Sequence, residues 1–427
     1  MPYTQVAELR IGSDLPAAVY AEGWQSWSPV RIHRVGESSL PALDERSPTT
    51  SLRPGKPVPE GVIQAEGILV LAPREGPARA WFAPEPGREV ATLRLESNGG
   101  MLELWADGAV DELQAGDLDG ALAAVGGRLG VPQVTAIPPG WCSWSCYSSR
   151  VTEQDVVENV EAALRRSVPI AIVQIDHGYE TDIGDWLHTS PGFGSLRRVA
   201  QRIRSASMQP GIWSAPFLVG PSSSLAMEHP DWLVRDADAG LHWNQWMRIL
   251  DVTHPAAAEH LAGVYRTLSD WGFSYHKVDF LYAGAIEGRR HSDCSGLDAY
   301  REGLRLVRAA IGPDALLLAC GAPLLPSIGL CDAMRVGPDV LPEGLGQEPD
   351  LESLFRITKT RSWMNGRFWV NDPDCLVARP EIVEREALAS FLEGYGGVAF
   401  SSDRLAALDA RGLELTRRVL GGAQLKS

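Results

Sequence analysis

The sequence predicts a (β/α)8 TIM barrel preceded by an antiparallel β-sandwich domain. Two observations lead to this fold class. The first 136 residues consist of short, roughly alternating strands, and the rest alternates short apolar runs with amphipathic helical stretches. The length of 427 residues is enough for two or three domains. With 44% apolar and 22% charged residues, the composition is that of a soluble globular protein with a large core.

The N-terminal segment, residues 1–136, has the pattern of an antiparallel sandwich. Its alternating runs are GVIQAEGILVLA, ARAWFA, ATLRLES and MLELWADG, and they are separated by Pro and Gly. The segment AIPPG at Ala136–Gly140 then interrupts the pattern. We therefore expect the sandwich to end at residue 136 and the barrel to begin at residue 137.

Eight strands are expected between residue 137 and about residue 405. They lie at Trp141–Tyr147, Ile170–Asp176, Gly211–Pro216, Tyr275–Phe280, Ala315–Cys320, Ala333–Gly337, Phe368–Asp372 and Gly397–Ser401. Amphipathic stretches separate them, such as TEQDVVENVEAALRRS with Thr152 as N-cap. Eight strand–helix units fit a (β/α)8 barrel. A doubly wound open sheet is the alternative, but it would want a Gly-rich phosphate loop, which GWCSWSCYSS lacks. Residues 406–427 are expected to form a short C-terminal helix or tail.

Charge and composition narrow the classes of partner. The net charge of −15 argues against nucleic acid and anionic lipid, whereas a neutral sugar is compatible with it. No apolar stretch is long enough to span a bilayer, and MPYTQVAELR lacks the features of a secretion signal. The six cysteines have no C-x-x-C spacing. We expect a cytoplasmic protein with free thiols and no metal.

Polar residues collect at the ends of the expected strands. Lys277 and Asp279 are two residues apart in SYHKVDFLYAG, so they share one face late in their strand. Other strand ends carry Asp176, Trp213, Cys320, Arg335, Asp339, Asn371, Asp372 and Asp374. A single Lys–Asp pair could simply plug a barrel, but carboxylates at several strand ends favour a pocket at the C-terminal mouth.

Two carboxylates facing a neutral polyol suggest glycoside hydrolysis. Lys277 beside Asp279 makes Asp279 the ionised nucleophile, and Asp339 from another strand is the candidate acid. A carboxyl separation of about 5–5.5 Å would imply retention of configuration, and a wider one inversion. The chain also has 14 Trp, whose rings stack on sugar faces, although about half are expected to be ordinary core residues.

Eight motifs in order resemble the alpha-galactosidases of glycoside hydrolase family 36 (clan D), most closely the compact bacterial members. They are GWCSW, GDW, GIWSAPF, EHPDW, KVDFLYAGA, CGAPLLPSIG, MRVGPD and NDPDCL. The resemblance implies a retaining mechanism, with Asp279 as nucleophile and Asp339 as acid/base. It further implies that the remaining matched residues bind the sugar, either in the galactose subsite or at its rim. These are Lys277, Asp176, Trp141, Trp213, Cys320, Arg335, Asp185, Trp186 and, from EGWQSWSP in the sandwich, Trp24 or Trp27.

The sequence departs from the family in two places. The family usually reads IDDG or IDDA where this chain reads IDHG, so His177 replaces a second Asp that grips galactose hydroxyls. A His can bond a hydroxyl but is not a two-oxygen acceptor, which weakens the galactose assignment more than the hydrolase assignment. The C-terminal β-sandwich of the family is also missing or reduced, so a homo-oligomer partner is a candidate to cover exposed barrel surface.

Three readings of function stay open. The first is a retaining alpha-galactosidase that acts on small oligosaccharides and needs no cofactor, because two carboxylates suffice. The second keeps the chemistry but changes the sugar, to an alpha-N-acetylgalactosaminide or a beta-L-arabinopyranoside, on account of His177. The third is a noncatalytic sugar-binding protein, against which the trio Asp279, Asp339 and Lys277 argues.

Overall fold

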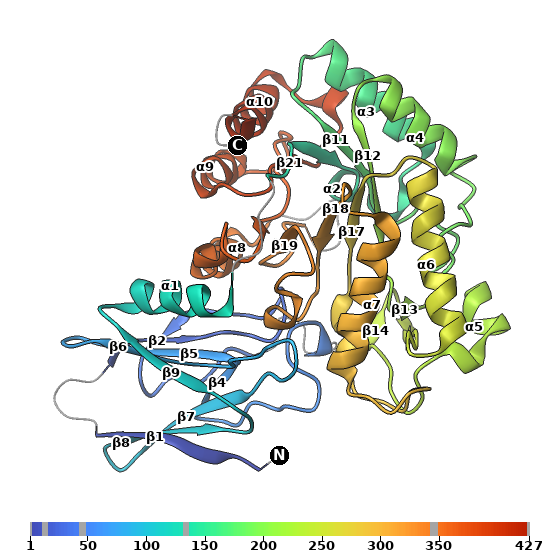
Figure 1. Cartoon of the computed structure of the whole chain (residues 1–427). Helices are drawn as coiled ribbons and strands as arrows, with labels where there is room; N and C mark the ends of the chain where they lie inside the picture. Colours follow the sequence, from blue (N-terminus) through green and yellow to red (C-terminus); the bar gives the residue numbers. More distant parts are fainter. Residues whose placement is uncertain (1, 11–15, 42–47, 131–135, 342–348, 425–427) are drawn as a thin grey trace.

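The structure, a computed structural model, describes residues 2–10, 16–41, 48–130, 136–341 and 349–424. Two layers of antiparallel strands form the N-terminal part, and a ring of parallel strands covered by helices forms the rest (Figure 1). The predicted β-sandwich followed by a TIM barrel is thereby confirmed. None of the helices in the described part of the chain combines the length and apolar character that a membrane span requires.

The sandwich consists of a four-stranded sheet, β1-β8-β7-β4, and a five-stranded sheet, β3-β2-β5-β6-β9. The strands are β1 (Thr4–Arg10), β2 (Pro16–Ala21), β3 (Ile32–His33), β4 (Ile63–Glu66), β5 (Ile68–Pro73), β6 (Ala78–Phe82), β7 (Thr92–Asn98), β8 (Met101–Ala106) and β9 (Asp111–Ala115). Burial alternates along β8, as expected for a strand with one face in the core. Leu69, Leu71, Trp81, Leu93 and Leu104 pack between the sheets.

Helix α1 (Leu118–Leu129) covers one sheet of the sandwich and touches the barrel (Figure 1). Asp117 caps its N-terminus by accepting from the Gly120 N–H. Its buried side chains Leu122 and Val125 face strands β5, β6 and β9 and the short helix η6 (Ser362–Met364). The last strand of the sandwich therefore ends well before residue 136, and a helix follows it inside the segment expected to be all β.

Eight parallel strands form the barrel, in the order β20-β19-β18-β17-β12-β11-β10-β21. They are β10 (Gly140–Cys142), β11 (Ile172–Ile175), β12 (Gln209–Ser214), β17 (Tyr275–Val278), β18 (Leu316–Ala319), β19 (Ala333–Arg335), β20 (Val370–Asp372) and β21 (Phe400–Ser401). Each expected strand contains or overlaps one of these; seven observed strands are shorter than expected, and β12 has the expected length but begins two residues earlier. Between β20 and β21, the Val398 N–H donates to the Asn371 carbonyl at 2.9 Å.

Helices surround the barrel, and short strands and 3-10 turns lie in the connections between the main elements (Figure 1). The helices are α2 (Trp144–Tyr147), α3 (Glu153–Arg165), α4 (Leu196–Ser205), α5 (Ser224–Glu228), α6 (Pro255–Asp270), α7 (Gly296–Ile311), α8 (Leu351–Thr360), α9 (Arg385–Tyr395) and α10 (Ala410–Gln424). The further short strands are β13 (Leu218–Val219), β14 (Leu241–His242), β15 (Gln245–Trp246) and β16 (Arg248–Ile249). The remaining 3-10 turns are η1 (Pro48–Thr50), η2 (Ser148–Arg150), η3 (Pro230–Trp232), η4 (Leu281–Ala285), η5 (Leu325–Ser327) and η7 (Leu405–Ala407).

One expectation about these elements needs correction. The strand expected at Trp141–Tyr147 stops at Cys142, and Trp144–Tyr147 is a helical turn. An apolar run cannot by itself distinguish a strand from a buried helical turn. At the C-terminus, where a short helix or tail was expected, α10 is a helix that packs against α9 and buries Leu415 and Leu420. By contrast, the N-cap expected at Thr152 is present, as part of a capping box with Asp155.

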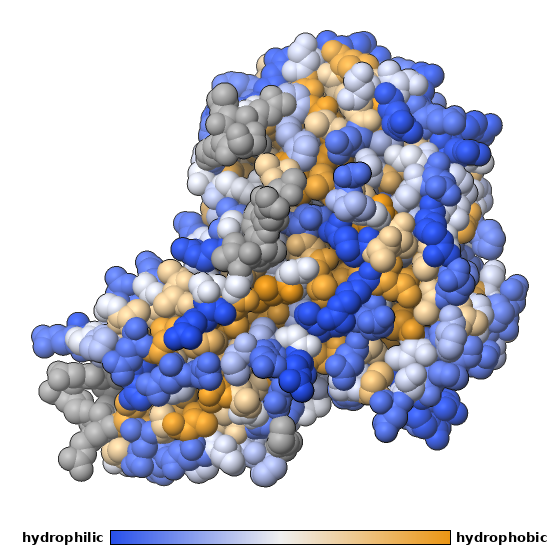
Figure 2. Space-filling model, viewed as in Figure 1, coloured by the Kyte–Doolittle hydropathy of each residue, from blue (hydrophilic) through white to orange (hydrophobic). Residues whose placement is uncertain are grey.

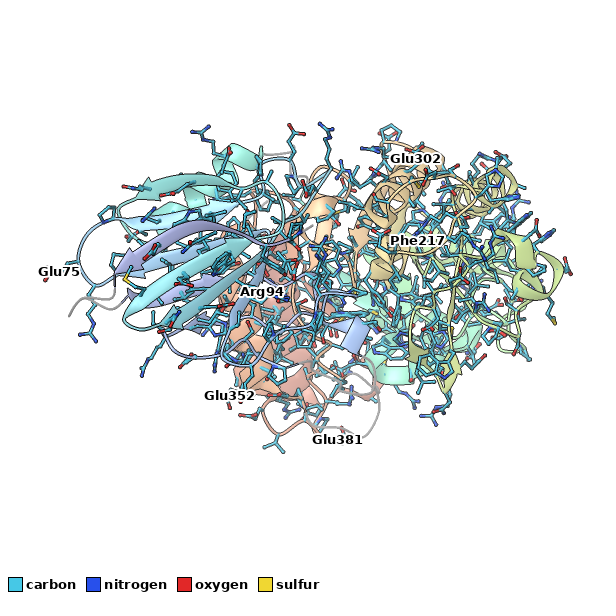
Figure 3. The ribbon with its side chains drawn as sticks, turned by 90° about the horizontal axis from the view of Figure 1, so that it is seen from below. Glu75, Arg94, Phe217, Glu302, Glu352 and Glu381 are labelled. Carbon is cyan, nitrogen blue, oxygen red and sulfur yellow. The ribbon has the colours of Figure 1, made fainter. Side chains whose placement is uncertain are left out.

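The two domains meet along a broad apolar junction. On the face drawn in Figure 2, apolar residues gather in the middle of the molecule, where sandwich and barrel join, and hydrophilic ones cover the outer helices. In Figure 3, seen from below, Glu75 marks the far end of the sandwich and Arg94 its strand β7. Phe217 lies inside the barrel, fully buried, whereas Glu302 projects from α7.

Candidate active site

A cavity of about 420 Å³ lies at the C-terminal mouth of the barrel. Asp176, Lys277, Asp279 and Asp339, each at or just beyond the end of a strand, line it together. His177, the residue that departs from the family pattern, lines the same cavity. Side chains from three different strand ends therefore face one space of a size that suits a small ligand.

Asp279 follows β17 and is held by donors on both carboxylate oxygens. The indole Nε1–H of Trp213 donates to Oδ2 at 3.0 Å, and the Phe280 N–H donates to Oδ1 at 2.7 Å. Phe280 itself has a left-handed φ of 50°. The ammonium of Lys277 lies 3.9 Å from Oδ2. Two hydrogen-bond donors and a cation therefore surround the Asp279 carboxylate.

Lys277 is paired mainly with Asp176. Its Nζ lies 3.0 Å from Asp176 Oδ2, which also accepts from Gln174 Nε2 at 2.6 Å. Burial lowers the pKa of Lys277, but the charges of Asp176 and Asp279 outweigh burial, so the net pKa stands well above its ordinary value. Lys277 therefore stays charged between two carboxylates that follow β11 and β17, which β12 separates in the sheet.

Asp339 sits in a different electrostatic environment. Burial raises its pKa to about 7, against the opposing charge of Arg335 and with help from the charge of Asp374. Arg335 donates to Asp339 Oδ1 at 2.7 Å, but it shares its guanidinium with Asp372 at 3.0 Å and Asp374 at 2.6 Å. The Asp339 side chain remains 27% exposed, toward the cavity. It can hold a proton near neutral pH and deliver it there.

Asp374 braces the loop that carries Asp339. One of its oxygens binds Arg335, and the other accepts from the Val340 N–H at 2.7 Å. The N–H of Asp374 in turn donates to Asp372 Oδ1 at 2.9 Å. The acidic pair of NDPDC thus fixes Asp339 through Arg335 and the backbone of Val340.

His177 is fixed by a carboxylate that the sequence did not single out. Its Nδ1 bonds Glu180 Oε1, and the second oxygen of Glu180 accepts from the Gly178 N–H at 3.1 Å. Burial lowers the pKa of His177, but the hydrogen bond and charge of Glu180, with the charges of Asp176 and Asp182, outweigh it. The net pKa of His177 is therefore raised.

Trp27 reaches the cavity from the sandwich domain. Its ring meets Phe280 edge-on with centroids 5.1 Å apart. The segment around it is anchored by Arg361 of the barrel, which is fully buried. The Arg361 side chain binds Glu22 Oε1 at 2.9 Å and the carbonyls of Ser26 and Ser28 at 2.7 and 3.0 Å. A barrel residue thus sets the position of the sandwich residue that lines the site.

Three further tryptophans line the cavity, of which Trp213 was expected and Trp144 and Trp243 were not assigned to it. Trp144 is the second Trp of GWCSW, so this motif contributes Trp144 to the cavity and not Trp141. Trp243 is at the tip of the β14–β15 hairpin, where it and Asn244 have φ values of 47° and 60°. A Trp in the left-handed region is strained, and such strain is typical of functional positions. The sequence signal that could have pointed to Trp243 is a bulky residue in a two-residue hairpin turn, where Gly, Asn and Asp are usual.

Several expected sugar-binding residues lie outside the cavity lining. The indole of Trp141 is buried and donates to the Asp403 carbonyl at 2.8 Å. Asp185 accepts from the Ser224 N–H at 2.9 Å at the start of α5. Trp186 packs edge-on against Trp213, with centroids 5.7 Å apart. Cys320 is fully buried. Each of these side chains is held by packing or by a hydrogen bond that the sequence pattern cannot predict. Arg335 likewise acts from behind, through Asp339.

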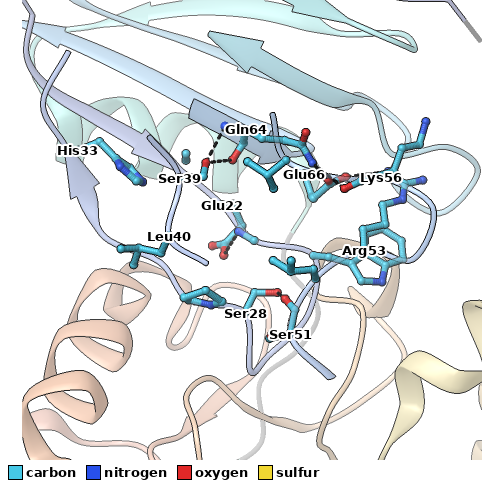
Figure 4. A pocket seen from close by; sticks show the side chains of 16 residues that line it. Glu22, Ser28, His33, Ser39, Leu40, Ser51, Arg53, Lys56, Gln64 and Glu66 are labelled. Carbon is cyan, nitrogen blue, oxygen red and sulfur yellow. Dashed lines mark hydrogen bonds and ion pairs between the residues drawn. The ribbon is translucent and has the colours of Figure 1, made fainter. Parts of the chain in front are cut away.

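Trp24 does not reach the barrel cavity and instead lines a separate cavity in the sandwich (Figure 4). That cavity measures about 40 Å³, too small for a sugar. Its polar groups bond one another: Arg53 reaches Glu66 at 2.9 Å, and Ser28 donates to the Ser51 carbonyl. Within the described residues, no cluster of His, Cys, Asp and Glu is arranged to hold a metal ion.

The chain also resembles known proteins in sequence and in structure. The family description Melibiase matches residues 175–293. The "Alpha-galactosidase 2" of Pediococcus pentosaceus is 25% identical over 137 residues, which are 31% of this chain and 19% of that protein. An alpha-galactosidase from Thermus thermophilus, solved with p-nitrophenyl alpha-D-galactopyranoside, is 27% identical with a TM-score of 0.82, covering 98% of this chain and 89% of that one.

The resemblance to the alpha-galactosidases of glycoside hydrolase family 36 is confirmed. AgaA, a family 36 alpha-galactosidase from Geobacillus stearothermophilus, shares the fold at 13% identity and a TM-score of 0.68, and this chain covers 62% of it. The matched segment spans about a fifth of the curated relative from Pediococcus pentosaceus, 19% of its length. The solved Thermus protein, by contrast, is covered over most of its length.

Proposed function

We propose that the protein is a retaining exo-glycoside hydrolase that removes terminal alpha-D-galactose from oligosaccharides. The observation that carries the proposal is the pair Asp279 and Asp339, which line one cavity in opposite environments. Asp279 is surrounded by donors and a cation, whereas burial raises the pKa of Asp339 to about 7. Glycoside hydrolysis needs two carboxyl groups in different roles, one that attacks the anomeric carbon and one that donates a proton.

The proposed reaction has two steps. In the first, an Asp279 oxygen attacks the anomeric carbon while Asp339 gives its proton to the departing glycosidic oxygen. In the second, Asp339 takes a proton from water, whose oxygen attacks the same carbon and releases the Asp279 carboxylate. Configuration is retained because the carbon is inverted twice. Lys277, held between Asp176 and Asp279, is proposed to bind a sugar hydroxyl.

Around these residues, the aromatic walls are proposed to hold the sugar. Trp213, Trp144, Trp27 and Trp243 line the cavity from four separate segments. Flat apolar ring faces with N–H donors at their edges suit a sugar, which has apolar faces and hydroxyl rims. Trp243, at the exposed hairpin tip, is placed on the side from which an oligosaccharide would enter.

The test is the variant Asp279→Ala assayed with p-nitrophenyl alpha-D-galactopyranoside. We expect turnover to fall by at least ~10³-fold, since a covalent route loses its nucleophile. Asp293→Ala, which changes an exposed aspartate, serves as the matched control and should behave as wild type. Circular dichroism checks that both variants fold. Turnover near wild type in Asp279→Ala would remove the proposed mechanism, and tight galactose binding by a wild type without turnover would favour a noncatalytic sugar-binding protein.

A second candidate keeps the chemistry and changes the sugar. It rests on His177, which lines the cavity where the family usually has a second carboxylate. A panel of aryl glycosides that includes alpha-N-acetylgalactosaminide and beta-L-arabinopyranoside separates the two candidates. A galactoside that ranks low in kcat/KM would favour the second.

Location and assembly are also proposals. The six cysteines are all free and five are buried, which suits a reducing cytoplasm. We propose a homo-oligomer that covers exposed barrel surface. Light scattering that gives a pure monomer at assay concentration would remove the oligomer, and a secretion assay would test the location.

A further inference from the structure

The His177–Glu180 pair is a built unit in the cavity wall. Glu180 uses both carboxylate oxygens, one on His177 Nδ1 and one on the Gly178 N–H at 3.1 Å. The Glu180 side chain is 1% exposed, and that of His177 is 16% exposed. Because Nδ1 is fixed on Glu180 and His177 lines the cavity, the opposite ring nitrogen, Nε2, is the atom left for a ligand. No described residue forms a hydrogen bond with it.

The contact with Glu180 favours the protonated form of His177. Buried carboxylates require a cationic partner or dense hydrogen bonding. Among the described residues, His177 is the cationic partner of Glu180, and no Lys or Arg reaches that carboxylate. The charged groups that act on His177 are Glu180, Asp176 and Asp182, all acidic, and together they outweigh burial and raise its pKa. A charged imidazole donates from both nitrogens and accepts from neither.

Aromatic rings around His177 favour the same state. The His177 ring centroid lies 5.0 Å from that of Trp243, 5.3 Å from Trp213 and 6.2 Å from Trp144. The electron-rich faces of indoles attract a cation at such distances. The rings also leave the imidazole little freedom to turn away from the cavity, since Glu180 holds its other side.

We propose that Glu180 is a positioning residue for His177, and that the pair presents a cationic hydrogen-bond donor to the sugar where the family pattern places an acceptor. This inference rests on the proposed sugar site and names its specificity. The donor selects sugars with an acceptor oxygen at this wall. A hydroxyl oxygen satisfies it, and the carboxylate of a hexuronic acid satisfies it more strongly because the bond is then charge-assisted.

The role of Glu180 predicts an effect of unusual sign. Simple electrostatics says that removing a negative charge near a binding cavity improves the binding of an anion. If Glu180 acts through His177, the variant Glu180→Gln leaves the imidazole without its carboxylate partner. The anion is then bound more weakly, although a negative charge has been removed.

Isothermal titration of the full chain at pH 7 with D-galactose and with D-galacturonate tests this. The measured quantity is the ratio of the galacturonate Kd to the galactose Kd. We expect Glu180→Gln to raise this ratio by about tenfold, the size of one charge-assisted hydrogen bond. Glu228→Gln, an exposed glutamate on α5, is the matched control and should keep the wild-type ratio. If Glu180→Gln does not fold, His177→Gln removes the same cation and carries the same expectation.

A ratio that stays the same or falls in the variant overturns the inference, because Glu180 then acts as an ordinary negative charge or not at all. The proposed function is judged separately, by wild-type turnover of the aryl galactoside. An active wild type with an unchanged ratio would refute the inference alone, whereas an inactive wild type would refute the proposed function alone.

Discussion

Replacing the proposed acid, Asp339, with Asn should stabilise the fold at high pH while it abolishes turnover. Burial raises the pKa of Asp339 from 3.8 to about 7, so the folded protein binds this proton more tightly than the unfolded chain does. Between pH 4 and pH 7 the folded state therefore holds more protons, and stability falls as pH rises through that window. The side chain of Asn does not titrate in this range, so the stability of the variant does not fall with rising pH at this position.

The size of the effect follows from the shift. A difference of about three pKa units corresponds to ~4 kcal/mol at 1.36 kcal/mol per unit. The side chain is 27% exposed, and solvent screening reduces this to about 2 kcal/mol. In a chain of this length, such a gain raises Tm by roughly 2–4 °C. Arg335 keeps Asp372 and Asp374 as partners in the variant, so its guanidinium is not left unpaired.

The assay is scanning fluorimetry of wild type and Asp339→Asn from pH 4 to pH 8. The Tm of the variant minus that of wild type should be near zero at pH 4, rise through pH 5–7 and level off above it. Asp293→Asn, an exposed aspartate, should show no such rise. A variant that is less stable than wild type at pH 8, or a Tm difference that does not depend on pH, would refute the assignment of a buried, proton-holding carboxyl to Asp339.

Three further outcomes are expected. The kcat/KM of wild type should decline as pH rises through about 7, because Asp339 must carry its proton, and a flat profile from pH 6 to pH 9 would contradict this. Arg361→Met leaves the buried Glu22 carboxylate without its cationic partner, so the free energy of unfolding should fall by about 3–5 kcal/mol. The same change should displace Trp27 and raise KM. A Tm within 1 °C of wild type would exclude Arg361 as the anchor of this segment. Trp243→Gly relieves a left-handed φ of 47° and should leave Tm unchanged or ~2 °C higher while KM rises several-fold; an unchanged KM would show that the ring does not contact substrate.

The architecture was predictable from local patterns. Alternating runs gave the sandwich, and the succession of apolar runs and capped helices gave eight strand–helix units in the right order. Boundaries were less predictable, because an apolar stretch such as Trp141–Tyr147 continues past the last ladder hydrogen bond into a helical turn. For the C-terminal segment the sequence left a short helix and a tail open, because the packing of α10 against α9 is visible only once the chain is folded.

Asp176, Lys277 and Asp279 were predictable because they lie near the carboxyl end of a barrel strand, and Asp339 because it closely follows one in the sequence. Positions that depend on loops were not, since a motif does not say which of its aromatics turns inward. Long-range partners were also out of reach. Arg361, for example, lies more than 300 residues from Glu22, and no local pattern connects them.

The central claim is that Asp279 forms a covalent bond to the sugar in the cavity it shares with Asp339. Incubating the wild-type protein with a 5-fluoro-alpha-D-galactopyranosyl fluoride slows the second step and lets the adduct accumulate, and peptide mass spectrometry then locates it. We expect one fluorinated hexosyl group, attached to Asp279 on the peptide that contains it. An adduct on another residue, or none in a protein that turns over galactosides, would contradict it.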